Sequence, residues 1–190
     1  MARPIESVEQ PETQRLEAAA SRPTPSRLCS RSCLSRAAAG LPRPMVFTNG
    51  VFDILHAGHV ECLQAARREG CSLVVGLNSD ASARNLCKGP GRPFNLAIDR
   101  ASVVAALECV SLAVVFDEPT PLAVLAELMP DVYVKGGDYE IESLAETSLV
   151  QRWGGRALAV DYRDGYSTTA LVKRILDTET GATRNCGGTR

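Results

Sequence analysis

The sequence predicts an α/β fold in which five parallel strands form one open sheet with helices on both of its faces. From Met45 onward, short β-branched runs alternate five times with longer helical patterns, and this alternation is typical of such a sheet. Each strand candidate is an almost continuous apolar run, as expected where helices cover both faces. Hydrophobic residues make up 45% of the 190 residues, which is enough for the core of one ordinary domain.

The first 44 residues differ in composition from the rest of the chain. They contain seven arginines, four glutamates and six of the eleven prolines, but no lysine, aspartate or aromatic residue. Such a segment is predicted to be a disordered N-terminal tail, residues 1–44, that adds nothing to a packed core. The simplest interpretation is a non-functional extension upstream of Met45, and a regulatory or docking role is the alternative.

The five strand candidates are short apolar runs. They are Met45–Thr48, Ser72–Leu77, Leu112–Phe116, Val132–Val134 and Ala157–Val160. Right-handed crossovers between parallel strands place every carboxyl end at one edge of the sheet. Ligands of doubly wound, Rossmann-like sheets bind at that edge, near the point where the strand order reverses. The functional residues are therefore expected directly after the strands.

Helical patterns fill the connections between these strands. Apolar residues recur at helical spacing in Gly58–Glu69 and Ala97–Leu107. Pro119-Thr120 is a helix entry, Gly154-Gly155 is a helix stop and Ser167 is a plausible N-cap. Three further helices are therefore expected at Pro121–Leu128, Leu144–Trp153 and Thr168–Leu176.

Composition and charge argue against several classes of function. A formal net charge of −1 gives no general reason to expect a nucleic acid partner, and no apolar run is long enough to cross a bilayer. The seven cysteines are an odd number without a CxxC pair, so a disulfide or zinc framework is not indicated and a reducing cytoplasm fits best. We expect one domain over residues 45–177 and a flexible C-terminal tail over 178–190.

Both histidines of the chain lie between the first strand and the first helix, in Thr48-Asn-Gly-Val-Phe-Asp-Ile-Leu-His-Ala-Gly-His59. Asn49-Gly50 permits a sharp turn, and Gly58 would let a phosphate approach the backbone without a Cβ in the way. The following helix directs free N–H groups toward the same space, and the spacing of His56 and His59 puts both rings on one face. A phosphorus centre under in-line attack gains negative charge and needs such donors.

Two other interpretations of this histidine pair stay open. An isolated pair is more often two ordinary histidines at a helix cap, although the twelve-residue string is far more specific than the pair alone. A His-x-x-His helix end could also bind zinc, but zinc sites use at least three protein ligands and no third is evident nearby, so no metal ligand is assigned. No nucleophile with an adjacent base is found, so a covalent enzyme intermediate is not indicated.

Further cations follow in later loops. Lys88 and Arg92 lie in a glycine- and proline-rich loop that could fold over a triphosphate and neutralise the leaving pyrophosphate; a solvated surface loop is the alternative. Lys135 and Asp138 follow the fourth strand around Gly-Gly, which leaves room for a ligand near the backbone. Asp138 is a candidate contact to sugar or base hydroxyls or a residue that helps to hold a metal, and a turn residue is the alternative.

Three hydroxyls stand together at the start of the last helix. Ser167, Thr168 and Thr169 could hold the β- and γ-phosphate oxygens of a nucleotide at the helix N-terminus. The preference for serine and threonine at N-caps would by itself explain the same residue types.

These strings resemble the signatures of the cytidylyltransferase-like nucleotidyltransferases over about Met45–Leu176. The HxGH element of that family matches His56, Gly58 and His59, and Gly-Tyr-Ser-Thr-Thr169 resembles its Ser/Thr-rich helix start. The resemblance implies His56, His59 and Lys88 as catalytic residues. It implies nucleotide contacts from Asn49, Gly50, Val51, Phe52, Gly58, Asp138, Arg163, Ser167, Thr168 and Thr169.

The same resemblance implies contacts to a sugar phosphate from four residues, Asp53, Arg92, Arg100 and Lys135. Arg100 lies where the family has a helix arginine, and a bidentate arginine fits phosphate well. An ordinary surface arginine is the alternative. The strings Lys-Gly-x-x-Arg-Pro93 and Val-Lys-Gly-Gly-Asp-Tyr139 look like those of the heptose 1-phosphate adenylyltransferases within the family.

That resemblance implies transfer of AMP from ATP to D-glycero-β-D-manno-heptose 1-phosphate, giving ADP-heptose and pyrophosphate for lipopolysaccharide core synthesis. It also implies Mg²⁺ bound with ATP, and a homo-oligomer, most commonly a dimer. A glycerol 3-phosphate cytidylyltransferase, which shares the fold and the histidine motif, is the main alternative. A nucleotide-binding module without activity and a dinucleotide-binding oxidoreductase are others, although no GxGxxG follows the first strand.

Overall fold

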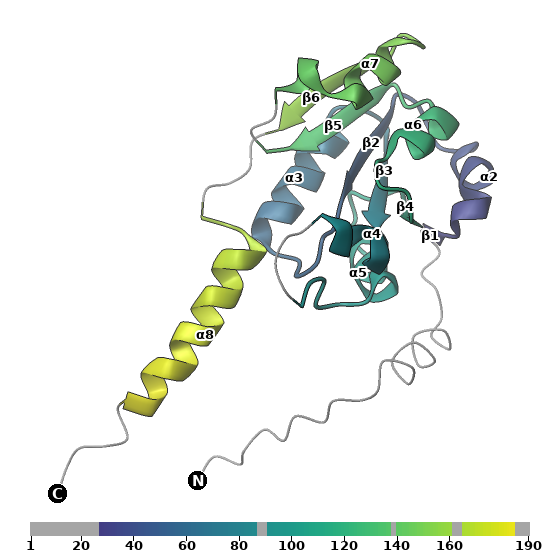
Figure 1. Ribbon diagram of the computed structural model, residues 1–190. Helices are drawn as coiled ribbons and strands as arrows, with labels where there is room; N and C mark the ends of the chain where they lie inside the picture. The colour runs from purple at the N-terminus through teal and green to yellow at the C-terminus, as the bar shows by residue number, and fades with distance from the viewer. Residues whose placement is uncertain (1–26, 87–90, 138–139, 161–164, 185–190) are drawn as a thin grey trace, which may run out of the picture.

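The computed structural model describes residues 27–86, 91–137, 140–160 and 165–184. Its centre is a parallel sheet of six strands in the order β1-β4-β3-β2-β5-β6 (Figure 1). The strands are β1 (Leu28–Cys29), β2 (Met45–Gly50), β3 (Ser72–Asn78), β4 (Leu112–Phe116), β5 (Val132–Gly136) and β6 (Arg156–Val160). The last five match the predicted strands to within two residues, so the prediction of a parallel sheet is confirmed and its strand number of five is wrong.

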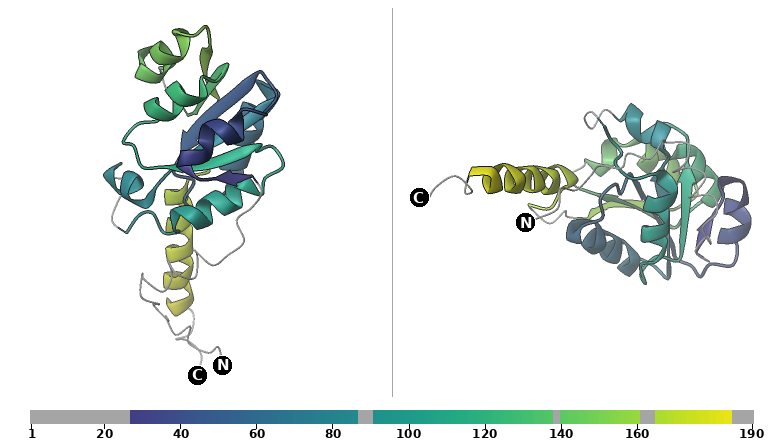
Figure 2. Two further views of the ribbon diagram at one scale, coloured as in Figure 1. Left: turned by 90° about the vertical axis from the view of Figure 1, so that its right-hand side faces the viewer. Right: turned by 90° about the horizontal axis from the view of Figure 1, so that it is seen from below.

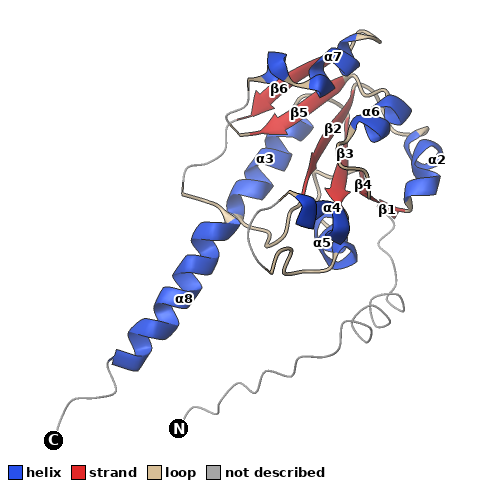
Figure 3. Cartoon of the chain, viewed as in Figure 1, coloured by secondary structure: helices blue, strands red, loops and turns tan. Residues whose placement is uncertain are grey.

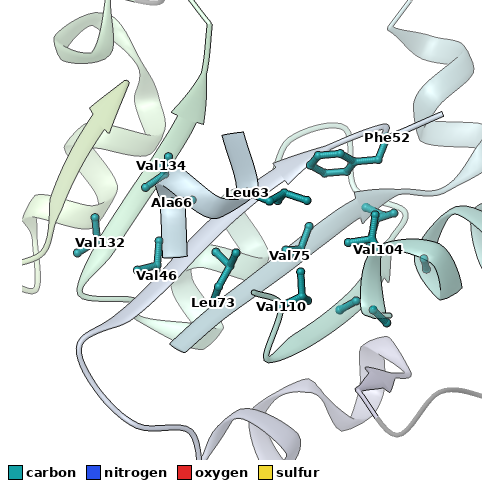
Figure 4. Close-up of a cluster of buried hydrophobic side chains, with 14 residues drawn as sticks. Val46, Phe52, Leu63, Ala66, Leu73, Val75, Val104, Val110, Val132 and Val134 are labelled. Carbon is teal, nitrogen blue, oxygen red and sulfur yellow. The ribbon is translucent and has the colours of Figure 1, made fainter. Parts of the chain in front are cut away.

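Helices cover both faces of the sheet, as expected for a doubly wound fold (Figure 3). Neighbouring residues of a strand point to opposite faces. Val46 of β2 belongs to the apolar cluster under α3 and α5, which Figure 4 shows, whereas Phe47 belongs to the cluster under α2, α6 and α7. These helices are α2 (Leu34–Ala38), α3 (Ala57–Arg68), α5 (Ala97–Ala105), α6 (Leu122–Leu128) and α7 (Ala145–Gln151).

The sixth strand lies in the segment that the sequence analysis assigned to a disordered tail. β1 pairs in parallel with β4, and α2 buries Leu34 and Ala38 on the sheet; a short 3₁₀ turn, η1 (Arg31–Cys33), joins the two. The tail prediction is therefore wrong for residues 27–44, and residues 1–26 lie outside the described ranges. Composition averaged over 44 residues hid a local apolar stretch that covers sheet surface beside α6.

The last helix is longer than predicted. α8 (Thr168–Arg184) continues eight residues beyond Leu176 and projects away from the sheet (Figure 2), so residues 178–184 are helical rather than part of a flexible tail. Helix-compatible residues run without a glycine as far as Gly181, and Thr178 Oγ1 donates to the carbonyl of Arg174 at 2.6 Å. No helix in the described parts of the chain is both long enough and apolar enough to span a membrane.

The strand order defines where a ligand can lie. The chain passes from β2 outward through β3 to β4 and then crosses back to β5 on the other side of β2. The reversal leaves a crevice at the carboxyl ends of β2 and β5, where doubly wound sheets bind ligands. α3, the short helix α4 (Asp80–Asn85) and α8 all begin at this edge, and a second 3₁₀ turn, η2 (Ile141–Ser143), precedes α7.

Candidate active site

A cavity of about 520 Å³ lies at this edge of the sheet. The ends of β2, β3 and β5, the starts of α3 and α8, and the loop between β4 and α6 all contribute to its wall. Twelve of the residues that the sequence analysis selected line it: Asn49, Gly50, Val51, Phe52, Asp53, His56, His59, Arg92, Lys135, Ser167, Thr168 and Thr169. Segments separated by more than one hundred residues thus meet around one space.

The histidine pair is built into the start of α3. His56 is the N-cap residue; its carbonyl accepts from the amide of Val60 at 3.2 Å, and its Nδ1 accepts from the amide of His59 at 3.4 Å. The two imidazoles are stacked, with ring centroids 3.8 Å apart and an interplanar angle of 19°. The His59 ring meets Phe52 edge-on at 5.3 Å. Both rings therefore sit side by side on the cavity wall.

The environment of His56 favours its neutral imidazole in the free protein. Burial lowers the pKa of His56 below its ordinary value, because removal from water disfavours the charged ring. With Nδ1 accepting from a backbone amide, the proton of neutral His56 is carried by Nε2. Two stacked rings at 3.8 Å also disfavour a double positive charge. His56 thus offers a neutral N–H donor beside the His59 ring, which suits an anion that gains charge during reaction.

The turn after β2 has a constrained backbone. Phe52 has φ of 49°, in the left-handed region that non-glycine residues rarely adopt. Its ring lies over Gly50, where a Cβ would come within 3.1 Å of Phe52 Cε2. Buried Tyr133 donates from its hydroxyl to Asn49 Oδ1 at 2.9 Å, which orients the Asn49 amide. This turn brings the chain from Gly50 to Asp53 along the cavity wall.

Gly58 lies in close packing with the His56 ring and with Tyr166. It does not line the cavity, and a Cβ at this position would lie 3.0 Å from Tyr166 Cβ and 3.2 Å from His56 Nδ1. The missing side chain therefore makes room for the His56 ring and for the chain that enters α8. This packing keeps the histidine in place, and the approach of a phosphate to the Gly58 backbone stays a prediction.

Asp53 also acts on protein atoms. Its carboxylate accepts from the amide of Phe94 at 2.9 Å and from the amide of Asn95 at 3.0 Å, and the Asn95 side chain donates to the Asp53 carbonyl at 2.9 Å. Asp53 is only 8% exposed. It anchors the chain just after Arg92, whose guanidinium reaches Thr169 Oγ1 at 3.2 Å. Asp53 therefore anchors this loop from the cavity wall, and its contact to the sugar phosphate stays a prediction.

The predicted phosphate contact of Arg100 is wrong, because its side chain is fully buried and does not line the cavity. Its guanidinium donates to the carbonyls of Asn95, Val51 and Asn78 and to the carboxylate of Asp80. The arginine type that binds phosphate equally well binds several carbonyls, so residue type and spacing could not separate the two roles.

Three predicted residues, Lys88, Asp138 and Arg163, lie outside the described ranges. Conversely, the cavity includes residues that the sequence analysis missed, among them Thr48, Asn78, Thr120, Glu146 and Tyr166. Tyr166 stands inside the Gly-Tyr-Ser-Thr-Thr169 string and could have been selected with it. Thr120 was interpreted only as part of a helix entry, and nothing in its local sequence indicates a cavity.

Comparison with known proteins agrees with this geometry. Residues 47–180 match the family model described as Cytidylyltransferase-like. The D-beta-D-heptose 1-phosphate adenylyltransferase of Bordetella bronchiseptica is 52% identical over 152 residues, which cover 79% of this chain and 94% of that protein. The Bifunctional protein HldE of Syntrophotalea carbinolica is 54% identical over 135 residues, 71% of this chain, and the chain spans only 27% of that protein's length.

Among solved structures, the lipopolysaccharide core biosynthesis protein from Thermoplasma volcanium GSS1 is similar to this chain. It shares 28% sequence identity, with a TM-score of 0.54, over 65% of this chain and 98% of that one. The similarity extends to nearly the full length of that structure, so the sheet and its helices are the shared part.

Proposed function

Because the chain belongs to the cytidylyltransferase-like family, we propose that it transfers AMP from ATP to D-glycero-β-D-manno-heptose 1-phosphate, releasing ADP-heptose and pyrophosphate. The observation that carries the proposal is the stacked pair His56 and His59 at the start of α3, on the wall of a cavity at the ligand edge of the sheet. The 52% identity to a relative named for this activity supports the choice of substrates. The product is a precursor for lipopolysaccharide core synthesis.

In this mechanism, an oxygen of the sugar 1-phosphate attacks the α-phosphorus of ATP in line. The bond from the α-phosphorus to the oxygen bridging to the β-phosphate breaks, and its electron pair leaves with pyrophosphate. His56 and His59 donate hydrogen bonds to the α-phosphate as its charge builds. Ser167, at the N-cap of α8, together with Thr169 and Arg92 holds the departing end of the triphosphate, because helix N–H groups and a guanidinium favour anions.

ATP is proposed to enter as its Mg²⁺ complex. In the described ranges, no three histidine, cysteine or acidic side chains lie close enough together to hold a metal ion, and the carboxylate of Asp53 is engaged by backbone amides. Mg²⁺ that arrives on phosphate oxygens with bound waters fits such a site. The ion supplies charge neutralisation on the triphosphate, and the protein supplies the donors around it.

The proposal also covers the cellular location, the oligomeric state and the roles of two lysines. We place the enzyme in the cytoplasm, since the five described cysteines are free thiols, as expected in a reducing compartment. The family resemblance supports a homodimer, which sedimentation at several protein concentrations would test. Lys88 retains its proposed role on the leaving pyrophosphate, and Lys135 retains its proposed contact to the sugar phosphate on the basis of its place in the cavity wall.

The test is a pyrophosphate-release assay with ATP or CTP, each offered with heptose 1-phosphate or glycerol 3-phosphate. Of the four combinations, we expect turnover only with ATP and heptose 1-phosphate. Preference for CTP and glycerol 3-phosphate would instead establish a cytidylyltransferase.

We further expect His59→Ala to lower turnover by about 10²–10³, by analogy with the loss of one oxyanion-hole donor. Arg156→Ala is the control, because it removes a surface ion pair with Glu69 outside the cavity. Circular dichroism verifies that both variants are folded. Near-normal turnover in folded His59→Ala would remove this histidine from the mechanism.

A further inference from the structure

The β4–α6 loop of the cavity wall is held from outside by the N-terminal segment. Pro119, Thr120 and Pro121 of this loop line the cavity. Just before them, Glu118 accepts from Nε and Nη2 of Arg31, both at 3.1 Å. The same guanidinium donates through Nη1 to Glu127 in the last turn of α6. One arginine of η1 therefore bridges the two sides of the lining segment.

The second carboxylate is held in a defined position as well. Glu127 Oε1 accepts from the hydroxyl of Ser35 at 2.5 Å and from its amide at 3.1 Å. Ser35 of α2 and Arg31 of η1 therefore bind the two oxygens of this side chain. The hydrogen bonds from Ser35 and Arg31 lower the pKa of Glu127, which keeps the carboxylate charged at neutral pH. The side chains of Arg31, Glu118 and Glu127 are each only about 30% exposed, so solvent screens this cluster less than a fully exposed pair.

The inner side of the same loop joins the network around the cavity. The carbonyl of Glu118 accepts from buried Ser82 Oγ at 3.0 Å, and Asn78 Nδ2 donates to that hydroxyl at 3.0 Å. Asn78 itself lines the cavity. Glu118 is thus fixed by its backbone from the β3–α4 side and by its side chain from Arg31. Removing Arg31 leaves only the inner attachment.

The strand order shows which half of the cavity this loop bounds. The groups proposed to hold the triphosphate stand at β2 and at α8, which follows β6, together with Arg92, whose guanidinium reaches Thr169 of α8. The loop, in contrast, follows β4 on the opposite side of β2. The acceptor must approach the α-phosphate opposite the leaving pyrophosphate. The β3–β4 half, walled by Asn78 and the Pro119–Pro121 segment, is left for the sugar of the acceptor, while its phosphate lies toward Lys135 at the end of β5.

We infer that Arg31 is a positioning residue for the acceptor. Its hydrogen bonds to Glu118 and Glu127 fix the Pro119–Pro121 wall against which the sugar phosphate is held. The inference rests on the proposed nucleotidyl transfer. It also gives the segment before Met45 a role in the site, through a side chain that never touches substrate.

The kinetic test compares the full chain with Arg31→Ala, Arg31→Lys, Glu118→Gln and Arg156→Ala. We expect Arg31→Ala and Glu118→Gln to raise the KM for the acceptor about tenfold and to leave the KM for ATP within about twofold, because small misplacement of a positioning wall weakens one substrate. Arg31→Lys should fall between wild type and Arg31→Ala, since an ammonium cannot make the forked contact. The matched control Arg156→Ala should leave both constants unchanged.

The inference would be overturned if Arg31→Ala raised the KM for the acceptor and the KM for ATP equally. It would also be overturned if both KM values in Arg31→Ala matched those in Arg156→Ala. The acceptor is whichever one supports turnover in the nucleotide and acceptor screen, so failure of the heptose assignment is seen in wild type and is distinct. Amide hydrogen exchange supplies a readout that needs no turnover. Exchange of the α6 amides, beginning with that of Leu125, which donates to the Pro121 carbonyl at 2.8 Å, should rise in Arg31→Ala and not in Arg156→Ala. Unchanged exchange there would also contradict the proposal that Arg31 fixes this segment.

Discussion

Arg100 shows how a charged side chain can serve a site without lining it, and Asp53 shows how a residue of the cavity wall can also anchor a neighbouring loop. The Arg100 guanidinium joins the turn after β2, the end of β3, the start of α4 and the chain before α5. Asp53 ties the turn after β2 to Phe94 and Asn95. The loops of the cavity wall are therefore linked by buried polar contacts, each with its partners satisfied, and such networks rigidify a structure.

This linkage predicts a large stability effect at Arg100. We expect Arg100→Ala to lower the free energy of unfolding by about 3–5 kcal/mol, because Asp80 and the carbonyls of three further residues lose a buried donor. Arg156→Ala, which breaks a more exposed pair, should cost less than about 1 kcal/mol. Urea denaturation measures both values. A cost for Arg100→Ala as small as that for Arg156→Ala would show that the loops do not depend on this guanidinium.

At the scale of elements, the unit formed by β1, η1 and α2 is the main departure from the predicted fold. It extends the sheet past β4 and brings Leu34 into the cluster under α6 and α7. A two-residue edge strand and a five-residue helix have little intrinsic stability. Burial against the rest of the domain therefore stabilises them, and local sequence signals for such short elements are weak.

A pair of leucine substitutions tests this packing. Leu34 has no exposed surface, whereas Leu176 on α8 is 56% exposed. We expect Leu34→Ala to lower the free energy of unfolding by about 2–5 kcal/mol through lost burial and a residual cavity. Leu176→Ala should change it by no more than about 0.5 kcal/mol. Equal small effects in urea denaturation would mean that α2 does not pack on the domain.

At the scale of the whole molecule, the sheet separates two apolar cores, and the reactivity of cysteines follows from their places relative to them. Burial raises the pKa of Cys62, on α3, to about 11. Cys33 lies half-buried in η1, where hydrogen bonding from Ser30 and the charge of Arg36 lower its pKa. Since the thiolate is the reactive form, the fold makes the Cys33 thiol more reactive than the Cys62 thiol.

Alkylation measures this difference. With iodoacetamide at about pH 8, Cys33 should be modified well before Cys62, because only Cys33 has both access and appreciable thiolate. Mass spectrometry of tryptic peptides at successive times gives both rates. In urea above the unfolding transition the two rates should converge. Modification of Cys62 in the folded protein as fast as that of Cys33 would contradict the described core.

Several features could be predicted from sequence because their signals are local. Continuous apolar runs indicated β2 to β6, and a serine before a helix indicated the cap at Ser167, whose hydroxyl accepts from the amide of Ala170 at 3.0 Å. The His56–His59 spacing predicted two rings on one face, and the stacked pair agrees. Each of these depends on residues within a few positions of one another, so the period and the residue type carry the information.

Tertiary structure alone decided which polar side chains face the cavity and which hold the protein together. Arg100 contacts the carbonyl of Val51, forty-nine positions away, and Arg31 contacts Glu127, ninety-six positions away. A guanidinium binds a carboxylate, a carbonyl or a phosphate with similar geometry, so its residue type leaves the partner undetermined. The partner is set by which loops the parallel sheet brings to one edge, and that depends on strand order, which no local pattern in the chain encodes.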